Sequence, residues 1–184
     1  MSKAIDFRFD SHKAIQAAGV LAQCDPSKSM ISRMRLLKLL YIADREALKE
    51  IGRPITGDRL VAMKKGPVLS RFYDMIKGPK GELDEFFEST GYHLKLIKSP
   101  DDGDLNRYEI KKLKEVSDRY KDLDDEELSE LTHAFPEWKK HDPGGSSETI
   151  SVEDVLDALG ASDQIEYVRQ NANMDLAVAE LWHK

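Results

Sequence analysis

The most strongly patterned part of the chain is residues 30–51, where apolar side chains recur at the three- and four-residue spacing of a helix. They form two adjoining stripes, which contain Leu36, Leu37, Leu40, Tyr41, Ala43, Ala47, Leu48 and Ile51. Together the stripes make an apolar arc too wide for a surface helix, so the pattern predicts a long helix buried in the core. Gly52 ends this helix and Pro54 prevents it from resuming.

Shorter amphipathic stretches predict further helices on both sides of the long one. Their apolar periodicity places them at residues 11–23, 69–76, 116–123, 124–135, 151–159 and 162–184, with one more short amphipathic piece at 83–87. Asp10 or Ser11 can cap the first of them, and Asp124 with Glu127 forms a capping pair before another. Pro136 is expected to end the segment that this pair begins.

Three short stretches have the pattern of strands. Residues 60–63 are an apolar run, and the Gly66-Pro67 pair that follows predicts a turn from this strand into the next helix. Residues 92–96 and 108–110 alternate apolar and polar side chains around a loop rich in Pro, Asp and Gly, a pattern typical of a β-hairpin. The expected fold is therefore mainly α (α+β): a compact helical domain around a long buried helix, in which the short strand and the β-hairpin form a small antiparallel sheet.

The length of 184 residues fits one domain, and a hydrophobic fraction of 40% is enough for a real core. Residues 141–148 contain proline, two glycines and two serines and are the best candidate for a loop. We expect residues 1–184 to form a single domain, of which residues 156–184 are a C-terminal helical arm.

The composition excludes several classes of protein. A formal net charge of −6 argues against binding to nucleic-acid phosphates, which requires a clustered basic excess. No apolar run approaches the roughly 20 residues that span a bilayer, and the first residues lack the apolar core of a secretory signal. Cys24 is the single cysteine, so it forms neither an internal disulfide nor a cysteine-based metal site. The sequence predicts a cytoplasmic protein.

Candidate catalytic residues are sparse. His133, His141 and Asp142 lie within ten residues of one another, close to Trp138, but their spacing is not a recognised metal-ligand pattern. No serine or cysteine has the context of a nucleophile elbow, and Gly144-Gly145 lacks the further residues of a phosphate loop. We therefore expect no enzyme, no metal and no cofactor, and keep a metal-dependent hydrolase built on His133 as a remote alternative.

Several polar side chains on the long helix call for a structural interpretation. Asp44 lies on its apolar face, where a charge is costly unless it is paired, and Arg59 or another basic residue of the following segment is the predicted partner. Arg33, Arg35 and Lys38 form a basic cluster at the start of the same helix. Because a DNA-recognition helix must expose its basic face, we interpret this cluster as a solvated patch.

A family resemblance covers the centre of the chain. Residues 36–77 read LLKLLYIADREALKEIGRPITGDRLVAMKKGPVLSRFYDMIK, and LSELTH at 128–133 with Trp138 follows downstream. The four motifs KLLYIAD, GRPITGD, AMKKGPV and the aromatic-rich helix, in this order and spacing, resemble the Panacea domain, also called the SocA-like antitoxin domain, over residues 32–155. One departure is Lys65, which stands where many members have an aromatic residue before the Gly-Pro pair.

The resemblance implies a prokaryotic or phage antitoxin with a role in phage defence. Such a protein neutralises, by direct protein–protein binding, a cognate toxin that an adjacent gene encodes. Members are associated with many unrelated toxins, including ones that stop translation by modifying tRNA, and no catalytic residues are known for the family. A homodimer, or a heterotetramer with the toxin, is compatible with this role. The alternative is a DNA-binding transcriptional repressor of its own operon, against which the negative charge counts.

Two surfaces are candidates for the toxin contact. The first is the turn and helix that follow the short strand, and the second is the apolar face of the C-terminal arm. The candidate residues are Lys64, Lys65, Pro67, Arg71 and Tyr73 on the first surface, and Ile165, Val168, Leu176 and Trp182 on the second. The 34 acidic residues of the chain also suggest that acidic surfaces complement a basic toxin.

Overall fold

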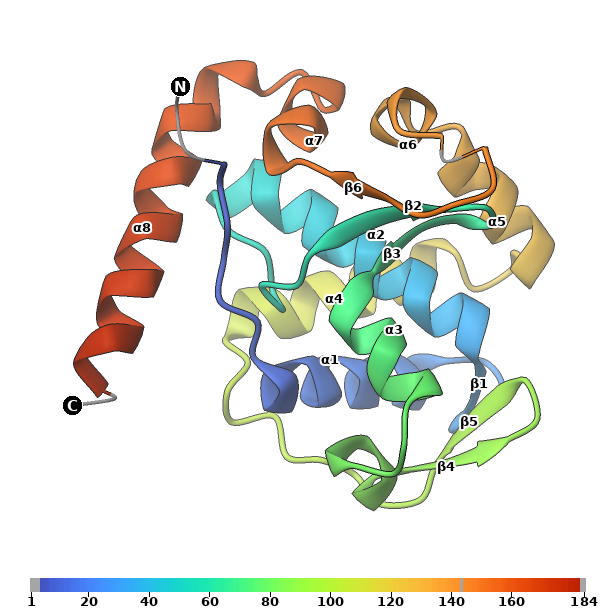
Figure 1. The fold of residues 1–184 in the computed structure, drawn as a ribbon. Coiled ribbons are helices and arrows are strands. Elements are labelled where there is room, and N and C mark those ends of the chain that lie inside the picture. Colours follow the sequence, from blue (N-terminus) through green and yellow to red (C-terminus); the bar gives the residue numbers. More distant parts are fainter. Residues whose placement is uncertain (1–3, 143, 183–184) are drawn as a thin grey trace.

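A long central helix organises the molecule (Figure 1). The computed structural model describes residues 4–142 and 144–182, except for the side chain of Trp182. Helix α2 (Arg33–Ile51) is buried along most of its length, as its double apolar stripe predicts. It begins three residues later than expected, because Met30–Ser32 form a strand, β1, and the Ser32 hydroxyl then caps the helix by accepting a hydrogen bond from Arg35 N.

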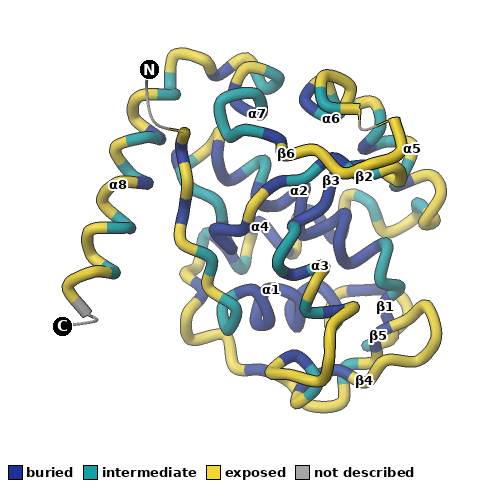
Figure 2. Tube along the Cα trace, in the orientation of Figure 1, coloured by how far each residue is buried: buried dark blue, intermediate teal, exposed yellow. Residues whose placement is uncertain are grey.

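The remaining helices surround α2. They are α1 (Ser11–Cys24), α3 (Ser70–Lys77), α4 (Arg107–Arg119), α5 (Asp125–His133), α6 (Pro136–Lys140), α7 (Val152–Ala158) and α8 (Ile165–Trp182), with 3-10 helices η1 (Glu82–Glu85) and η2 (Ser162–Gln164). Helices α1, α4 and α5 all pack against α2, and α1 also packs against α4. Figure 2 shows the result, a buried centre of α1 and α2 beneath an exposed outer layer. None of the helices in the described part of the chain is long and apolar enough to cross a membrane.

The strands form two small antiparallel sheets, so the expectation of a mainly α fold with a little β structure is confirmed, but a single sheet is wrong. One sheet has the order β1-β5-β4, with β4 (Phe87–Thr90) and β5 (His93–Leu96). The other has the order β3-β2-β6, with β2 (Leu60–Met63), β3 (Gly66–Leu69) and β6 (Glu148–Ile150). Strand β6 begins at Glu148, the last residue of the predicted loop, and pairs with β2 across nearly half of the chain.

The predicted hairpin between residues 92–96 and 108–110 is wrong in its second strand. Strand β5 pairs with β4, which precedes it, through a turn at Gly91. Tyr108 and Ile110 instead lie in α4, which begins with a complete capping box between Asn106 and Glu109. Two apolar residues spaced two apart do not distinguish a strand from a helix, whereas reciprocal caps fix a helix start.

Gly66-Pro67 is also not the predicted turn from strand to helix. The pair opens β3, which runs antiparallel to β2, so the turn of this hairpin is at Lys64-Lys65 and α3 begins only at Ser70. Gly66 has φ +96°, and a Cβ there would lie 2.6 Å from both Lys38 Nζ and Thr132 Oγ1. A glycine is needed at this position because two other elements approach its backbone.

Pro136 likewise begins a helix where an end was predicted. Helix α5 already ends at His133, and Pro136 occupies the first turn of α6, where its missing N–H leaves no hydrogen bond unmade.

The C-terminal arm is docked on the domain. In Figure 1, α8 lies along one side of the molecule, with the N-terminal segment between it and the body. Val168 and Ala172 are buried, Asn171 Nδ2 donates to Gly52 O at 3.1 Å, and Arg53 pairs with Asp175 at 3.3 Å. The inner apolar face of the arm is therefore occupied by the chain itself.

Asp44 is buried as predicted, but its partner is not Arg59. Its Oδ1 accepts hydrogen bonds from the backbone N–H groups of Ile55 at 3.0 Å and Thr56 at 3.1 Å, and its Oδ2 accepts from the Thr56 hydroxyl at 2.5 Å. Arg59 is exposed. Backbone donors satisfy the carboxylate without the cost of burying a second charge. Burial raises the pKa of Asp44 to about 7.

Replacing Asp44 with alanine is expected to lower the free energy of unfolding by about 3 kcal/mol, because it leaves two buried N–H groups and a hydroxyl without their acceptor. Asp44→Asn keeps the acceptor for both N–H groups and is expected to cost less. Urea titrations followed by circular dichroism measure both changes. An alanine variant as stable as the wild type would contradict this role of Asp44.

The wild type and Asp44→Asn together also test how the stability depends on pH. The folded carboxyl titrates near 7 and the unfolded one near 3.8, so between these values the folded chain holds the extra proton. The contribution of Asp44 to stability is therefore expected to fall as the pH rises from about 4 to 7. The wild type should lose stability relative to Asp44→Asn over this range.

Candidate functional site: a basic and apolar groove

A groove of about 730 Å³ lies where five parts of the fold meet. These are the start of α2, the β2–β3 hairpin, α3, the β4–β5 turn and the start of α5. The residues that line it are Arg33, Met34, Leu37, Lys38, Met63, Lys64, Lys65, Gly66, Val68, Tyr73, Lys77, Tyr92, Asp125, Glu126 and Ser129. Its volume is in the range of typical ligand and peptide pockets.

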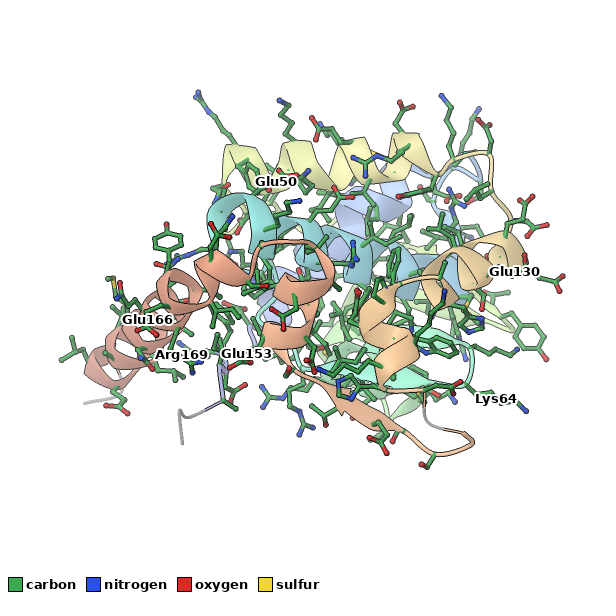
Figure 3. All side chains as sticks on the ribbon, turned by 90° about the horizontal axis from the view of Figure 1, so that it is seen from above. Glu50, Lys64, Glu130, Glu153, Glu166 and Arg169 are labelled. Atoms are coloured by element: carbon green, nitrogen blue, oxygen red, sulfur yellow. The ribbon has the colours of Figure 1, made fainter. Side chains whose placement is uncertain are left out.

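Apolar and cationic side chains make up most of the lining. Met34, Leu37, Met63, Val68 and Tyr73 supply the apolar part. The cationic residues are Arg33, Lys38, Lys64, Lys65 and Lys77, and the acidic ones are Asp125 and Glu126. Figure 3 shows the Lys64 side chain extending away from the protein at the hairpin turn.

Three side chains hold the backbone of the hairpin in place. Lys38 Nζ donates to Pro67 O at 2.8 Å, Ser129 Oγ donates to Lys65 O at 3.1 Å, and Trp138 Nε1 donates to Met63 O at 3.0 Å. The first comes from the KLLYIAD motif and the other two from the segment that contains LSELTH and the tryptophan. These motifs thus meet in space to position the turn that carries Lys64 and Lys65.

Lys38 is a buried amine beside the groove. Its side chain is fully buried, and its one hydrogen bond in the described part of the chain is to the Pro67 carbonyl. Burial lowers its pKa to about 7. Arg35, its neighbour in the predicted basic cluster, is also buried and pairs with Asp25 at 2.6 Å. The interpretation of this cluster as a solvated patch is therefore wrong for both residues.

Helix α3 depends on a distant cap. Leu69 precedes the helix and has no capping side chain, but the buried Asp58 carboxylate accepts from Arg71 N at 3.0 Å and Phe72 N at 2.8 Å. Burial also raises the pKa of Asp58. This role of Asp58 was not predicted from the sequence, although a helix without a local capping residue is a signal that another segment supplies one.

The structure divides the predicted site residues. Lys64, Lys65 and Tyr73 line the groove. Pro67 is buried in β3, and Arg71 lies outside the groove, with its guanidinium 5.7 Å from the centre of the Phe9 ring.

The residues predicted on the C-terminal arm do not reach the groove. Val168 is buried, and Ile165 and Leu176 are half-buried on α8. Helix α8 lies near the C-terminal end of α2, whereas the groove lies at its N-terminal end. The side chain of Trp182 is outside the described part of the chain. The groove also contains Met34, Leu37, Lys77 and Tyr92, which were not predicted as binding residues. Their positions in the sequence pattern are typical of core or loop residues.

The residues of the alternative metal site do not lie together in the structure. The His133 ring stacks on Trp138 with 4.2 Å between ring centres, and His141 Nε2 lies 2.5 Å from the Asp154 carboxylate. Over residues 4–142 and 144–182, no group of three His, Cys, Asp or Glu side chains is placed to hold a metal ion. The geometry therefore gives no support to metal-dependent hydrolysis.

The described residues thus form a mainly α fold in which side-chain hydrogen bonds hold a hairpin beside a basic and apolar groove. The chain matches the model of the family described as "Antitoxin SocA-like, Panacea domain" over residues 36–139. It belongs to this family, whose match includes most of the groove and all of the residues that hold the hairpin. No curated protein and no solved structure matches the chain.

Replacing Lys38 with methionine is expected to change the pH dependence of stability. The folded amine titrates near 7 and the unfolded one near 10.5, so between these values the unfolded chain holds the extra proton. The stability of the wild type relative to Lys38→Met should therefore rise with pH, by at most about 1.4 kcal/mol per pH unit. Urea titrations at pH 7.5, 8.5 and 9.5 measure it.

Lys64→Met is the matched control, because it removes an exposed lysine from the same hairpin. Its stability difference from the wild type is expected to change much less over this range. An equal response of the two variants would contradict a buried, weakly basic Lys38.

Proposed function

We propose that this protein is an antitoxin that neutralises a cognate protein toxin by binding it directly. Membership of the SocA-like antitoxin family is the observation that carries the proposal. The family supports an antitoxin-type, non-enzymatic role, and the residues of the groove suit a protein contact.

We propose the face around the β2–β3 hairpin as the toxin-binding surface. Three side-chain hydrogen bonds already fix the backbone of this hairpin, so little conformational entropy is lost when a partner binds there. On α8, the other candidate, Val168 is buried and Ile165 and Leu176 are half-buried against the chain's own residues. The groove is therefore favoured over the arm.

The alternative of a DNA-binding repressor has less support. The basic cluster that could contact DNA lies at the start of α2. Two of its residues, Arg35 and Lys38, are buried and have hydrogen-bond partners inside the protein. A helix that reads DNA must present such residues to the major groove. The net charge of −6 also opposes approach to a phosphate backbone.

The toxin is expected to be a cytoplasmic protein encoded beside this one, and co-expression tests this. The neighbouring gene alone is expected to arrest growth, and this protein expressed with it should restore growth. Gel filtration of the two purified proteins should show one stable complex. We expect the interface of this complex to bury about 1,600 Å² or more.

A stop codon early in the antitoxin gene is the control, since it keeps the transcript but removes the protein. A neighbour that is harmless alone, or that still arrests growth beside the intact antitoxin, would contradict the proposal. Restoration of growth without any complex would point to repression of the operon, which a mobility shift with the upstream DNA measures.

A further inference from the structure

We infer that the groove binds an acidic segment of the toxin, with at least one apolar side chain in the groove and carboxylates on its cationic rim. This inference rests on the proposed antitoxin function and adds the chemistry of the partner at one defined site. Three observations support it: the unpaired cations of the groove, one buried donor without an acceptor, and the apolar lining.

The cations of the groove are unpaired within the described part of the chain. Arg33, Lys38, Lys64, Lys65 and Lys77 form none of its salt bridges. Lys77 has a different contact, in which its Nζ lies 4.6 Å from the centre of the Tyr73 ring. Since the whole chain has 34 acidic residues against 28 basic ones, carboxylates are not scarce, and their pairing elsewhere leaves this groove basic.

Cations elsewhere in the fold illustrate the contrast. Arg35 pairs with Asp25, Arg45 with Glu137, and Lys112 with both Glu46 and Glu50. In the groove, Asp125 instead accepts a hydrogen bond from the Ser32 hydroxyl at 2.6 Å. Even without Lys38, whose buried amine has a pKa of about 7, the four other cations of the groove outnumber its two carboxylates, so its charge complements an acidic partner.

One of these cations has a buried donor without an acceptor. The Nε atom of Arg33 is buried and has no hydrogen-bond partner. Leaving such a group unsatisfied is unfavourable, and more so when it is charged. A carboxylate of a bound partner is the group that satisfies a guanidinium best, because its two oxygens match the spacing of the N–H donors.

The apolar lining selects the rest of the segment. Met34 and Met63 are flexible side chains that adapt to different apolar shapes, and Leu37 and Val68 lie between them in the lining. Tyr92, 86% exposed, adds an aromatic ring from the β4–β5 turn. Exposed aromatic side chains beside a pocket are common anchors in protein interfaces. A protein segment can supply both an apolar side chain for this lining and carboxylates for the cationic rim.

The charge relation is the reverse of the one suggested by composition. The excess of acidic residues suggests an acidic antitoxin surface against a basic toxin. At the groove, however, the antitoxin supplies the cations and the toxin is expected to supply the carboxylates.

Carbodiimide cross-linking of the full-length complex tests the contact directly, because it joins an amine to a carboxylate only when the two touch. The probe is the protein encoded by the neighbouring gene. Mass spectrometry is expected to find Lys64, Lys65 or Lys77 joined to Asp or Glu of the toxin. Cross-links from the toxin only to lysines outside the groove, such as Lys95 or Lys114, would overturn the inference.

Charge reversal tests the energetics. The double variant Lys64→Glu/Lys65→Glu is expected to weaken toxin binding about 30-fold or more, measured by isothermal titration calorimetry, because it replaces attraction by repulsion at the rim. Lys95→Glu/Lys114→Glu is the matched control, since it makes the same change of charge at two exposed lysines elsewhere, and should weaken binding less than about 3-fold. Thermal unfolding checks that both variants are folded.

Tyr92→Ala tests the apolar part of the contact, with an expected loss of about 10-fold in affinity for the toxin.

If the charge-reversal variant binds the toxin and restores growth like the wild type, the acidic-segment inference fails while the antitoxin function stands. If the wild type itself does not bind, the proposed function fails. A labelled tRNA that binds the wild type and not the charge-reversal variant would make nucleic acid the occupant and overturn the inference.

Discussion

The buried carboxylate of Asp44 is the interaction on which the arrangement of the site depends. This carboxylate lies within the central helix and accepts hydrogen bonds from the backbone N–H groups of Ile55 and Thr56. It therefore fixes the path of the chain between α2 and β2. Two residues further on, Asp58 does the same for the start of α3. The two aspartates thereby hold the chain on both sides of the β2–β3 hairpin, before it at Ile55 and Thr56 and after it at Arg71 and Phe72. A loss of either set of hydrogen bonds would leave buried donors unsatisfied.

The same hairpin is also held by side chains from elsewhere in the chain. Ser129 and Trp138, from later in the chain, donate hydrogen bonds to the carbonyl groups of Lys65 and Met63, and Lys38 of α2 donates one to that of Pro67. This explains in physical terms why the downstream part of the family match accompanies the upstream part: each segment supplies hydrogen bonds that the other needs. The hairpin is thus rigid before any partner binds, which lowers the entropic cost of binding.

The groove also shows where the fold accepts a local cost in stability. A buried Lys38 with one hydrogen bond and an Arg33 Nε without an acceptor are both unfavourable in the free protein. Elsewhere the chain pairs its buried charges closely, as at Arg35 with Asp25 and Arg45 with Glu137. A basic groove in an acidic protein is consistent with a surface whose polar groups are completed by a partner, as in the proposed antitoxin function.

The sequence by itself determined the features that depend on neighbouring residues. The double apolar stripe identified α2 as a core helix, the Asp124–Glu127 box marked the start of α5, and the motif spacing identified the family. It did not determine which strands pair, which donors satisfy Asp44, or which residues line the groove. Strands β2 and β6 lie nearly ninety residues apart, and the groove combines side chains from Arg33 to Ser129. Periodicity and caps are encoded within one or two turns of chain, whereas hydrogen bonds and charge pairs between distant segments arise only when the core has packed.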